Sequence, residues 1–207
     1  MAGRAAPLIA LMLLAGCGGH DKRPERAAPV DWRSMATQPD RDRLRGWRTA
    51  WDAALAKARL ADPQAIAGDA ALFDPDHALA DPTLPPGRYR CRTYKLGGAG
   101  TAMRDFTAYP WFECNVADEG EVVSLDKRTG SQRPTGLLFK DSAGGGRLIF
   151  LGTLMLGDET APLRYGTDAT RDMIGYVERI GPKRWRWVVP SPRFESLLDV
   201  TELVPVE

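Results

Sequence analysis

The pattern of apolar and polar residues divides the chain into a helical segment and a later series of short strands. Between residues 39 and 60, apolar residues recur at steps of three and four, which is the spacing of an amphipathic helix. The apolar stripe contains two indoles and is formed by Leu44, Trp47, Trp51, Leu55 and Ala58. From Gly87 onward the period changes to two, which predicts strands with one buried face.

The longest apolar run outside the N-terminus covers residues 147–157, and we expect it at the centre of the fold. Its residues do not alternate cleanly with polar ones, as in a strand that is buried on both faces. Gly152 in its middle offers a place to bend or bulge. We expect one face of this strand inside a β-barrel and the other face beneath the N-terminal helix.

Short turns separate nearly all of the strand candidates, which predicts an antiparallel meander. The other candidates are residues 88–96, 106–116, 122–127, 135–140, 173–180, 184–189 and 194–204, with 163–165 as a ninth strand if it pairs. A meander avoids exposed edges best by closing on itself. The predicted fold class is therefore mainly β: an antiparallel up-and-down (lipocalin-like) barrel of about eight strands, with one N-terminal amphipathic helix packed outside.

The N-terminus has the pattern of an export signal. Arg4 is followed by an apolar run over residues 8–15 that is too short to span a bilayer. Leu14-Ala15-Gly16-Cys17 looks like the lipobox of bacterial lipoproteins, which implies cleavage before Cys17 and lipid attachment to it; the alternative is a plain signal peptide with an incidental cysteine. Because Gly18 stands where an Asp is associated with inner-membrane retention, we expect the outer membrane, on the leaflet that faces the periplasm.

These patterns predict four segments. Residues 1–16 are expected to be a lipoprotein signal peptide. Residues 17–30 are expected to be a disordered tether, because this second segment is polar and has no apolar period. Residues 31–86 are a helical segment and linker, and 87–207 the antiparallel barrel, with helix and barrel forming one globular domain. The balance of 28 basic against 27 acidic residues gives no electrostatic footprint for nucleic acid, so the membrane is expected as a partner only through the lipid.

Cys91 and Cys114 fall on the apolar faces of consecutive strand candidates. An exported protein meets an oxidising compartment, where a disulfide between adjacent strands is the economical interpretation. Two buried thiols or a redox pair are the alternatives, although no Cys-x-x-Cys motif supports a redox pair.

Candidate chemistry is sparse. Asp158 and Glu159 lie in the longest connection between strands, where paired carboxylates could do acid/base work or contact a ligand, although loop carboxylates are usually solvated. Arg90 and Arg92 share one strand face and could hold an anionic ligand inside a barrel mouth, or be solvated outside. No set of ligands has the spacing of a metal loop, and we expect neither a metal nor another cofactor.

Two further patterns admit a structural and a chemical interpretation. Trp185 and Trp187 share a face of a late strand, where they fill the core or form a ligand platform. Ser124-Leu125-Asp126-Lys127 spells the Ser-x-x-Lys of penicillin-recognising enzymes, but those enzymes place it at a helix start, whereas a strand is predicted here. No catalytic residue is therefore assigned.

Several local sequences together resemble domain of unknown function family 4893, found in exported bacterial proteins. They include Asp31-Trp32-Arg33, Tyr89-Arg90-Cys91-Arg92, Ser131-Gln132-Arg133-Pro134 and Gly157-Asp158-Glu159-Thr160. The resemblance covers about residues 31–205 and implies no activity. We expect a lipid-anchored, non-catalytic envelope protein that binds an unidentified envelope protein or small ligand; the alternative is a hydrolase or lyase that uses loop carboxylates near Asp158 and Glu159.

Overall fold

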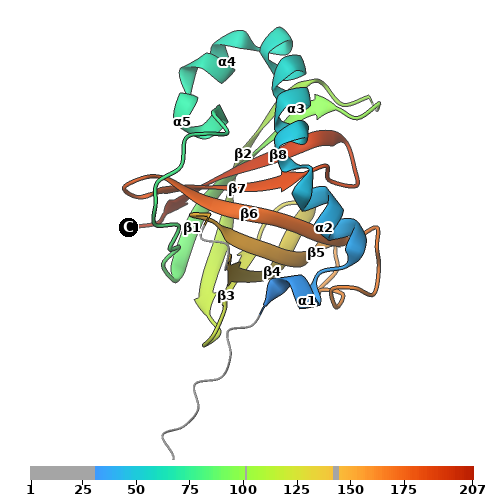
Figure 1. Cartoon of the computed structure of the whole chain (residues 1–207), viewed down its shortest axis with the longest axis vertical. Coiled ribbons are helices and arrows are strands. Elements are labelled where there is room, and N and C mark those ends of the chain that lie inside the picture. The colour runs from blue at the N-terminus through green and yellow to red at the C-terminus, as the bar shows by residue number, and fades with distance from the viewer. Residues whose placement is uncertain (1–30, 101, 142–144) are drawn as a thin grey trace, which may run out of the picture.

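The computed structural model describes residues 31–100, 102–141 and 145–207, and eight antiparallel strands close into a barrel in the order β1 to β8 (Figure 1). Consecutive strands pair throughout, and β1 pairs with β8 to complete the barrel. The predicted mainly β fold class is thereby confirmed. The strands are β1 (Gly87–Gly98), β2 (Phe106–Asp118), β3 (Val123–Lys127), β4 (Gln132–Lys140), β5 (Leu148–Leu156), β6 (Asp172–Gly181), β7 (Arg184–Pro190) and β8 (Ser196–Pro205).

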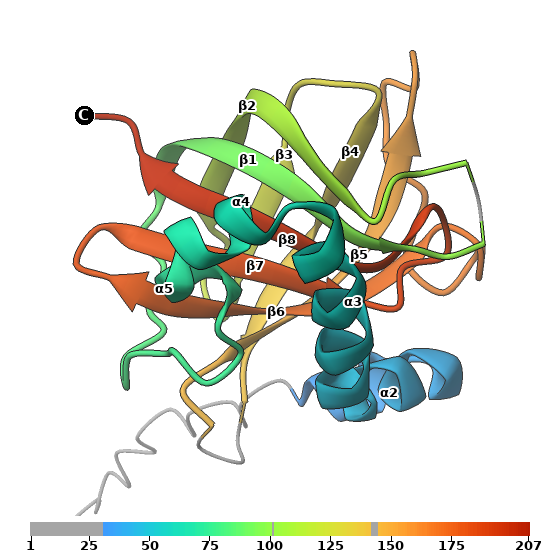
Figure 2. The ribbon, with the colours of Figure 1, turned by 90° about the horizontal axis from the view of Figure 1, so that it is seen from above.

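The helical segment precedes the barrel and packs on one of its sides, whereas β2, β3 and β4 lie on the opposite side (Figure 2). Its elements are α1 (Trp32–Met35), α2 (Gln38–Arg45), α3 (Trp47–Ala61), α4 (Pro63–Gly68) and α5 (Ala70–Phe73). Aspartate and threonine side chains cap four of these helices by accepting hydrogen bonds from backbone N–H groups of the first turn. None of the helices in the described ranges is both long and apolar enough to cross a membrane.

The single helix expected over residues 39–60 is divided in two. Thr37 caps α2, which ends at Arg45, and α3 begins at Trp47 after Gly46. Glycine is a poor residue for a helix interior, and the sequence stripe did not reveal the interruption because its spacing continues across Gly46. The stripe is nevertheless buried as expected: Trp51 and Ala58 are 0% exposed, and Trp47 is partly buried.

The central apolar run forms β5, and its two faces serve the two cores that the sequence predicts. Ile149 and Leu151 pack in the cluster beneath the helices, whereas Phe150 and Leu154 pack inside the barrel. Gly152 is needed for close approach to β4, since a Cβ there would lie 2.2 Å from the carbonyl oxygen of Thr135. The helices lie mainly across other strands, with α3 against β1 and β8 and α2 against β6.

The disulfide between Cys91 and Cys114 is present and joins β1 to β2. Both cysteines point into the barrel, where they are at most 2% exposed and pack with Tyr89 and Val116. The period of two along each strand placed both cysteines on the inner face, so this prediction is confirmed. Because the bond is buried among apolar side chains, it contributes to the core of the barrel rather than to an exposed redox site.

Between the helices and the outer face of the sheet lies a network of buried ion pairs. Glu178, 1% exposed, accepts hydrogen bonds from Arg186 Nε at 2.7 Å and from Arg147 Nε at 2.5 Å. Arg186, 0% exposed, also donates to the carbonyl oxygens of Leu72 at 3.2 Å and Asp74 at 2.5 Å. Arg186 thus supplies partners for the carbonyl groups at the end of α5 and pins that helix to the sheet.

Candidate functional site

The interior of the barrel is filled at one end and hollow at the other. At the filled end, Leu84, Tyr89 and Trp185 pack with the disulfide, and the Trp185 indole donates to the carbonyl oxygen of Thr83 at 3.0 Å. Phe150 and Trp187 continue this packing toward the middle, with ring centroids 4.5 Å apart. Any binding site inside the barrel must therefore lie beyond Trp187, at the other end.

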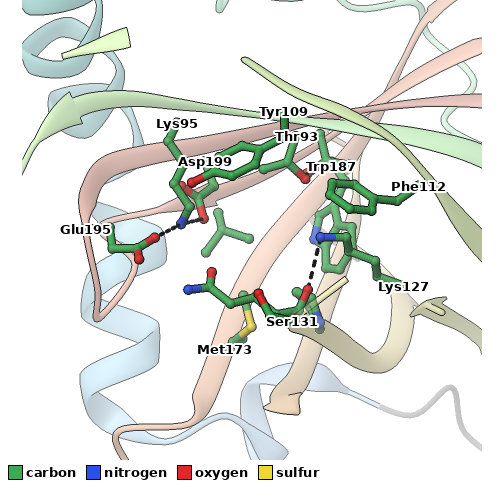
Figure 3. Close-up of a pocket in the computed structure, with 14 residues that line it drawn as sticks. Thr93, Lys95, Tyr109, Phe112, Lys127, Ser131, Met173, Trp187, Glu195 and Asp199 are labelled. Carbon is green, nitrogen blue, oxygen red and sulfur yellow. Dashed lines mark hydrogen bonds and ion pairs between the residues drawn. The ribbon is translucent and has the colours of Figure 1, made fainter. Parts of the chain in front are cut away.

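That hollow end, which we call the mouth cavity, has a volume of about 230 Å³. It lies where β3 ends and β8 begins, beside the loops that join β3 to β4 and β7 to β8. The side chains drawn in Figure 3 line it, including aromatic, hydroxyl and charged groups. The lining residues are Thr93, Lys95, Tyr109, Phe112, Lys127, Ser131, Gln132, Pro134, Met173, Trp187, Val189, Glu195, Asp199 and Thr201.

Lys95 occupies one side of the mouth cavity together with two carboxylates (Figure 3). Its Nζ lies 3.0 Å from Glu195 Oε2 and 3.2 Å from Asp199 Oδ2, and the lysine is 5% exposed. Burial by itself lowers the pKa of Lys95, but the adjacent Asp199 and Glu195 outweigh burial, so the net pKa is raised. Lys95 is therefore a charged residue whose partners are supplied by the protein.

Lys127 lies on the other side of the cavity and has a different environment. Its Nζ donates to the carbonyl oxygen of Gln132 at 3.0 Å and lies 3.8 Å from the centre of the Phe112 ring. No carboxylate of the described residues comes within ion-pair distance of this ammonium group. Burial, reinforced by the charge of Lys95, lowers the pKa of Lys127 to about 8. The ammonium group is thus desolvated without a full counter-charge.

Trp187, which also lines this cavity, has a second incompletely satisfied group. The side chain is 2% exposed, and its Nε1 has no hydrogen-bond partner among the described residues. An unpaired buried N–H is costly, because water is lost without a replacement partner. The adjacent wall is better satisfied: Thr201 is the cross-strand neighbour of Trp187, and its hydroxyl lies 3.0 Å from that of Thr93, so that the two hydrogen-bond to each other. The two Trp interpretations therefore separate, with Trp185 in the core and Trp187 at the cavity.

The loop carboxylates predicted as candidates lie outside the barrel. Asp158 and Glu159 border a surface groove with Asp126 and Arg133, and this groove shares only Lys127 with the lining of the mouth cavity. Glu159 accepts from Arg171 Nη1 at 2.9 Å and from the backbone N–H of Leu156 at 2.8 Å, and the hydrogen bond from Arg171 lowers its pKa. A carboxylate held in its ionised form by an arginine is poorly suited to act as a general acid.

The candidate arginines lie on the outer surface of β1. Arg90 stacks over Trp111 at 5.1 Å, and Arg92 Nε donates to the carbonyl oxygen of Tyr109 at 2.8 Å. Neither side chain lines the mouth cavity, so the outer of the two predicted placements is the one observed. A contact between these arginines and a partner stays a prediction.

The Ser-x-x-Lys pattern does not form a nucleophile and base pair. Ser124 points outward, where its hydroxyl donates to Glu119 Oε1 at 3.1 Å, whereas Lys127 lines the barrel interior. Residues three apart on a strand face opposite sides, which explains the separation. Within the described ranges, no group of three or more His, Cys, Asp or Glu side chains is placed to hold a metal ion. Cys17, the predicted lipidation site, lies outside the described residues.

The sequence pattern did not lead us to predict Lys95, Lys127 and Glu195 as cavity residues, although a signal for the two lysines was present. Lys95 continues the inward face of Tyr89, Cys91 and Thr93, and Lys127 shares its face with Leu125. A charged residue at the end of an otherwise apolar strand face marks the point where a barrel interior becomes polar. Glu195 is in a loop, so no periodic pattern could have placed it there.

Comparison with known proteins identifies one family. Residues 32–203 match the family described as domain of unknown function (DUF4893), a range that includes the helices and all eight strands except the end of β8. No curated protein and no solved structure matches the chain.

Proposed function

Since the chain belongs to this family of unknown function, we propose from the mouth cavity itself that the protein is a non-catalytic, lipid-anchored envelope protein that binds a small molecule inside its barrel. The observation that carries the proposal is the buried Nε1 of Trp187, which has no partner in the described part of the chain. Trp187 lines the same cavity as Lys127, whose ammonium group has no carboxylate of the described residues within ion-pair distance. Convergent unsatisfied polar groups within aromatic walls are typical of ligand sites.

The alternative of a hydrolase or lyase near Asp158 and Glu159 finds little support in the geometry. Arg171 and a backbone N–H already engage the carboxylate of Glu159. Among the described residues, no histidine lines the mouth cavity, and the two carboxylates that line it both lie beside Lys95. A binding role needs only the groups that are present, so we favour it over catalysis.

Placement in the envelope rests on the lipobox at Cys17 and is supported by the disulfide, because such bonds persist in oxidising compartments. We expect the wild-type chain to partition into the detergent phase and Cys17→Ser to remain in the aqueous phase. Phase separation of cell extracts, followed by immunoblotting, measures this. A Cys17→Ser chain that still enters the detergent phase would refute the lipid anchor.

Small-molecule binding is tested with N-phenyl-1-naphthylamine, a neutral dye that fluoresces in apolar surroundings. The full-length wild-type chain should bind it, and Thr201→Phe should abolish binding, because Thr201 lines the cavity and is 7% exposed. Thr49→Phe, on the exposed side of α3, is the matched control and should bind normally. Circular dichroism verifies that both variants are folded. Equal dye binding by a folded Thr201→Phe variant would contradict the proposal.

A further inference from the structure

The charges in the mouth cavity are not distributed evenly. Figure 3 shows Lys95, Glu195 and Asp199 together on one side, and Lys127, Phe112 and Trp187 together on the other. On the first side, the ammonium group has two carboxylates within 3.2 Å. On the second side, the ammonium group has a carbonyl oxygen and an aromatic ring as neighbours. On the side that contains Lys127, hydrogen-bond donors are therefore available for an anion, because the protein supplies no anionic partner of its own among the described residues.

The groups beside Lys127 restrict which anion fits. Lys127 Nζ supplies the charge and Trp187 Nε1 is a second donor, whereas Phe112, Met173 and Val189 provide apolar walls. A doubly charged phosphate normally binds to several cations or to bidentate arginines, and no arginine in the described part of the chain lines this cavity. The carboxylates of Asp199 and Glu195 across the cavity further disfavour a second negative charge. One carboxylate joined to a compact apolar group matches these features.

We propose that the mouth cavity selects small monocarboxylates, with the ligand carboxylate at Lys127 Nζ and Trp187 Nε1 and its apolar part against Phe112 and Met173. This proposal rests on the proposed function, because it names the ligand class of the same cavity. The ligand carboxylate gives Trp187 Nε1 its missing acceptor and gives the Lys127 ammonium group a counter-charge in addition to its hydrogen bond to Gln132. Pairing with the ligand also compensates for the desolvation of the Lys127 ammonium group.

Phenylacetate and phenylacetamide form a matched pair of probes, because they have nearly the same shape and differ in charge. We expect the full-length wild-type chain to bind phenylacetate at least about tenfold more tightly than phenylacetamide, as measured by isothermal titration calorimetry. Phenyl phosphate, which carries a second charge, should bind more weakly than phenylacetate. This comparison requires no variant and so does not depend on whether a substitution folds.

Lys127→Met then locates the preference, because it removes the charge and keeps an unbranched apolar side chain. In this variant the two probes should bind with equal affinity, whereas the control Lys183→Met, on the outer surface, should keep the wild-type preference.

Wild-type affinity for phenylacetate should also fall about tenfold from pH 7 to pH 9, because Lys127 has a pKa of about 8 and loses its charge.

The outcomes distinguish this inference from the proposed function. Equal affinity of the wild-type chain for both probes, or tighter binding of phenyl phosphate, would overturn the monocarboxylate assignment while leaving a small-molecule cavity intact. Absence of phenylacetate binding in a chain that binds N-phenyl-1-naphthylamine would do the same. Failure of the dye itself to enter the cavity contradicts the proposed function.

Discussion

Buried polar side chains occur on both faces of the barrel wall, and the two groups differ in how fully the protein supplies their partners. Beneath the helices, Glu178 and Arg186 are at most 1% exposed, and side chains or backbone carbonyl groups of the chain satisfy both. In the mouth cavity, no carboxylate of the described residues lies within ion-pair distance of Lys127, and none of these residues accepts a hydrogen bond from the indole N–H of Trp187. The first group holds α5 against the sheet, and the second leaves donors available.

This difference separates a group of side chains that stabilises the fold from a group that is suited to binding. A buried charge that lacks a partner destabilises the fold, so a group such as Arg186 persists only when the chain completes its hydrogen bonds. Donors left incomplete at Lys127 and Trp187 have a cost in the free protein that a bound carboxylate would offset. The comparison therefore predicts that substitutions beneath the helices change stability, whereas substitutions in the cavity mainly change binding.

The largest effect is expected from breaking the fully paired network. Arg186→Met leaves Glu178 buried with a single remaining arginine partner and removes a donor from the carbonyl oxygens of Leu72 and Asp74. We expect the free energy of unfolding to fall by about 3–5 kcal/mol, measured by urea denaturation. Arg45→Met, at an exposed pair with Asp42, should change it by less than about 0.5 kcal/mol. Similar losses in both variants would contradict the importance of the buried network.

A smaller effect should appear when two buried tryptophans are compared. Trp51 Nε1 donates to the hydroxyl of Tyr176 at 2.6 Å, whereas Trp187 Nε1 has no such partner in the described chain. Trp51→Phe should therefore cost about 1–3 kcal/mol more in unfolding free energy than Trp187→Phe, because only the former loses a hydrogen bond and strands a buried hydroxyl. Equal costs in urea denaturation would show that the two indoles are equally satisfied.

The smallest effect concerns the charge of Lys127 in the absence of ligand. Folding lowers its pKa from 10.5 to about 8, so between these values the unfolded chain binds more protons than the folded chain. Stability from this group must rise as pH increases through that window. Lys127→Met should be slightly more stable than wild type at pH 7, by less than about 1 kcal/mol since the amine is only partly buried, and this advantage should shrink steadily above pH 8 and disappear above a pH of about 10.5.

Urea denaturation of the two chains at several pH values measures that difference, in which the titration of all other groups cancels. A stability advantage that is constant from pH 7 to pH 10 would mean that the pKa of Lys127 is not lowered by folding. The matched variant Lys183→Met controls for the loss of a lysine elsewhere, since Lys183 lies on the surface beside Glu207.

The helices and strands were predictable because their apolar residues recur at a regular period, whereas the cavity was not predictable. Alternation along residues 88–96 placed Cys91 on the inner face of the barrel. The spacing of Trp51 and Leu55 placed both on the helix face that packs against the outside of the barrel. The cavity depends instead on which strands become neighbours and on where the loop that carries Glu195 folds back. Such contacts between distant residues leave no local period, although Lys95 at the end of an apolar face was a usable signal.

The two indole groups allow the central claim to be tested in one spectrum. The full-length chain labelled with ¹⁵N has six tryptophans, and Trp51→Phe and Trp187→Phe identify their indole N–H resonances. On addition of phenylacetate, we predict that the Trp187 resonance shifts and its hydrogen exchange slows, because its N–H gains a partner. The Trp51 resonance should stay in place, since Tyr176 already accepts its hydrogen bond. A Trp187 resonance that does not move while phenylacetate binds, or a Trp51 resonance that moves as far, would contradict the account.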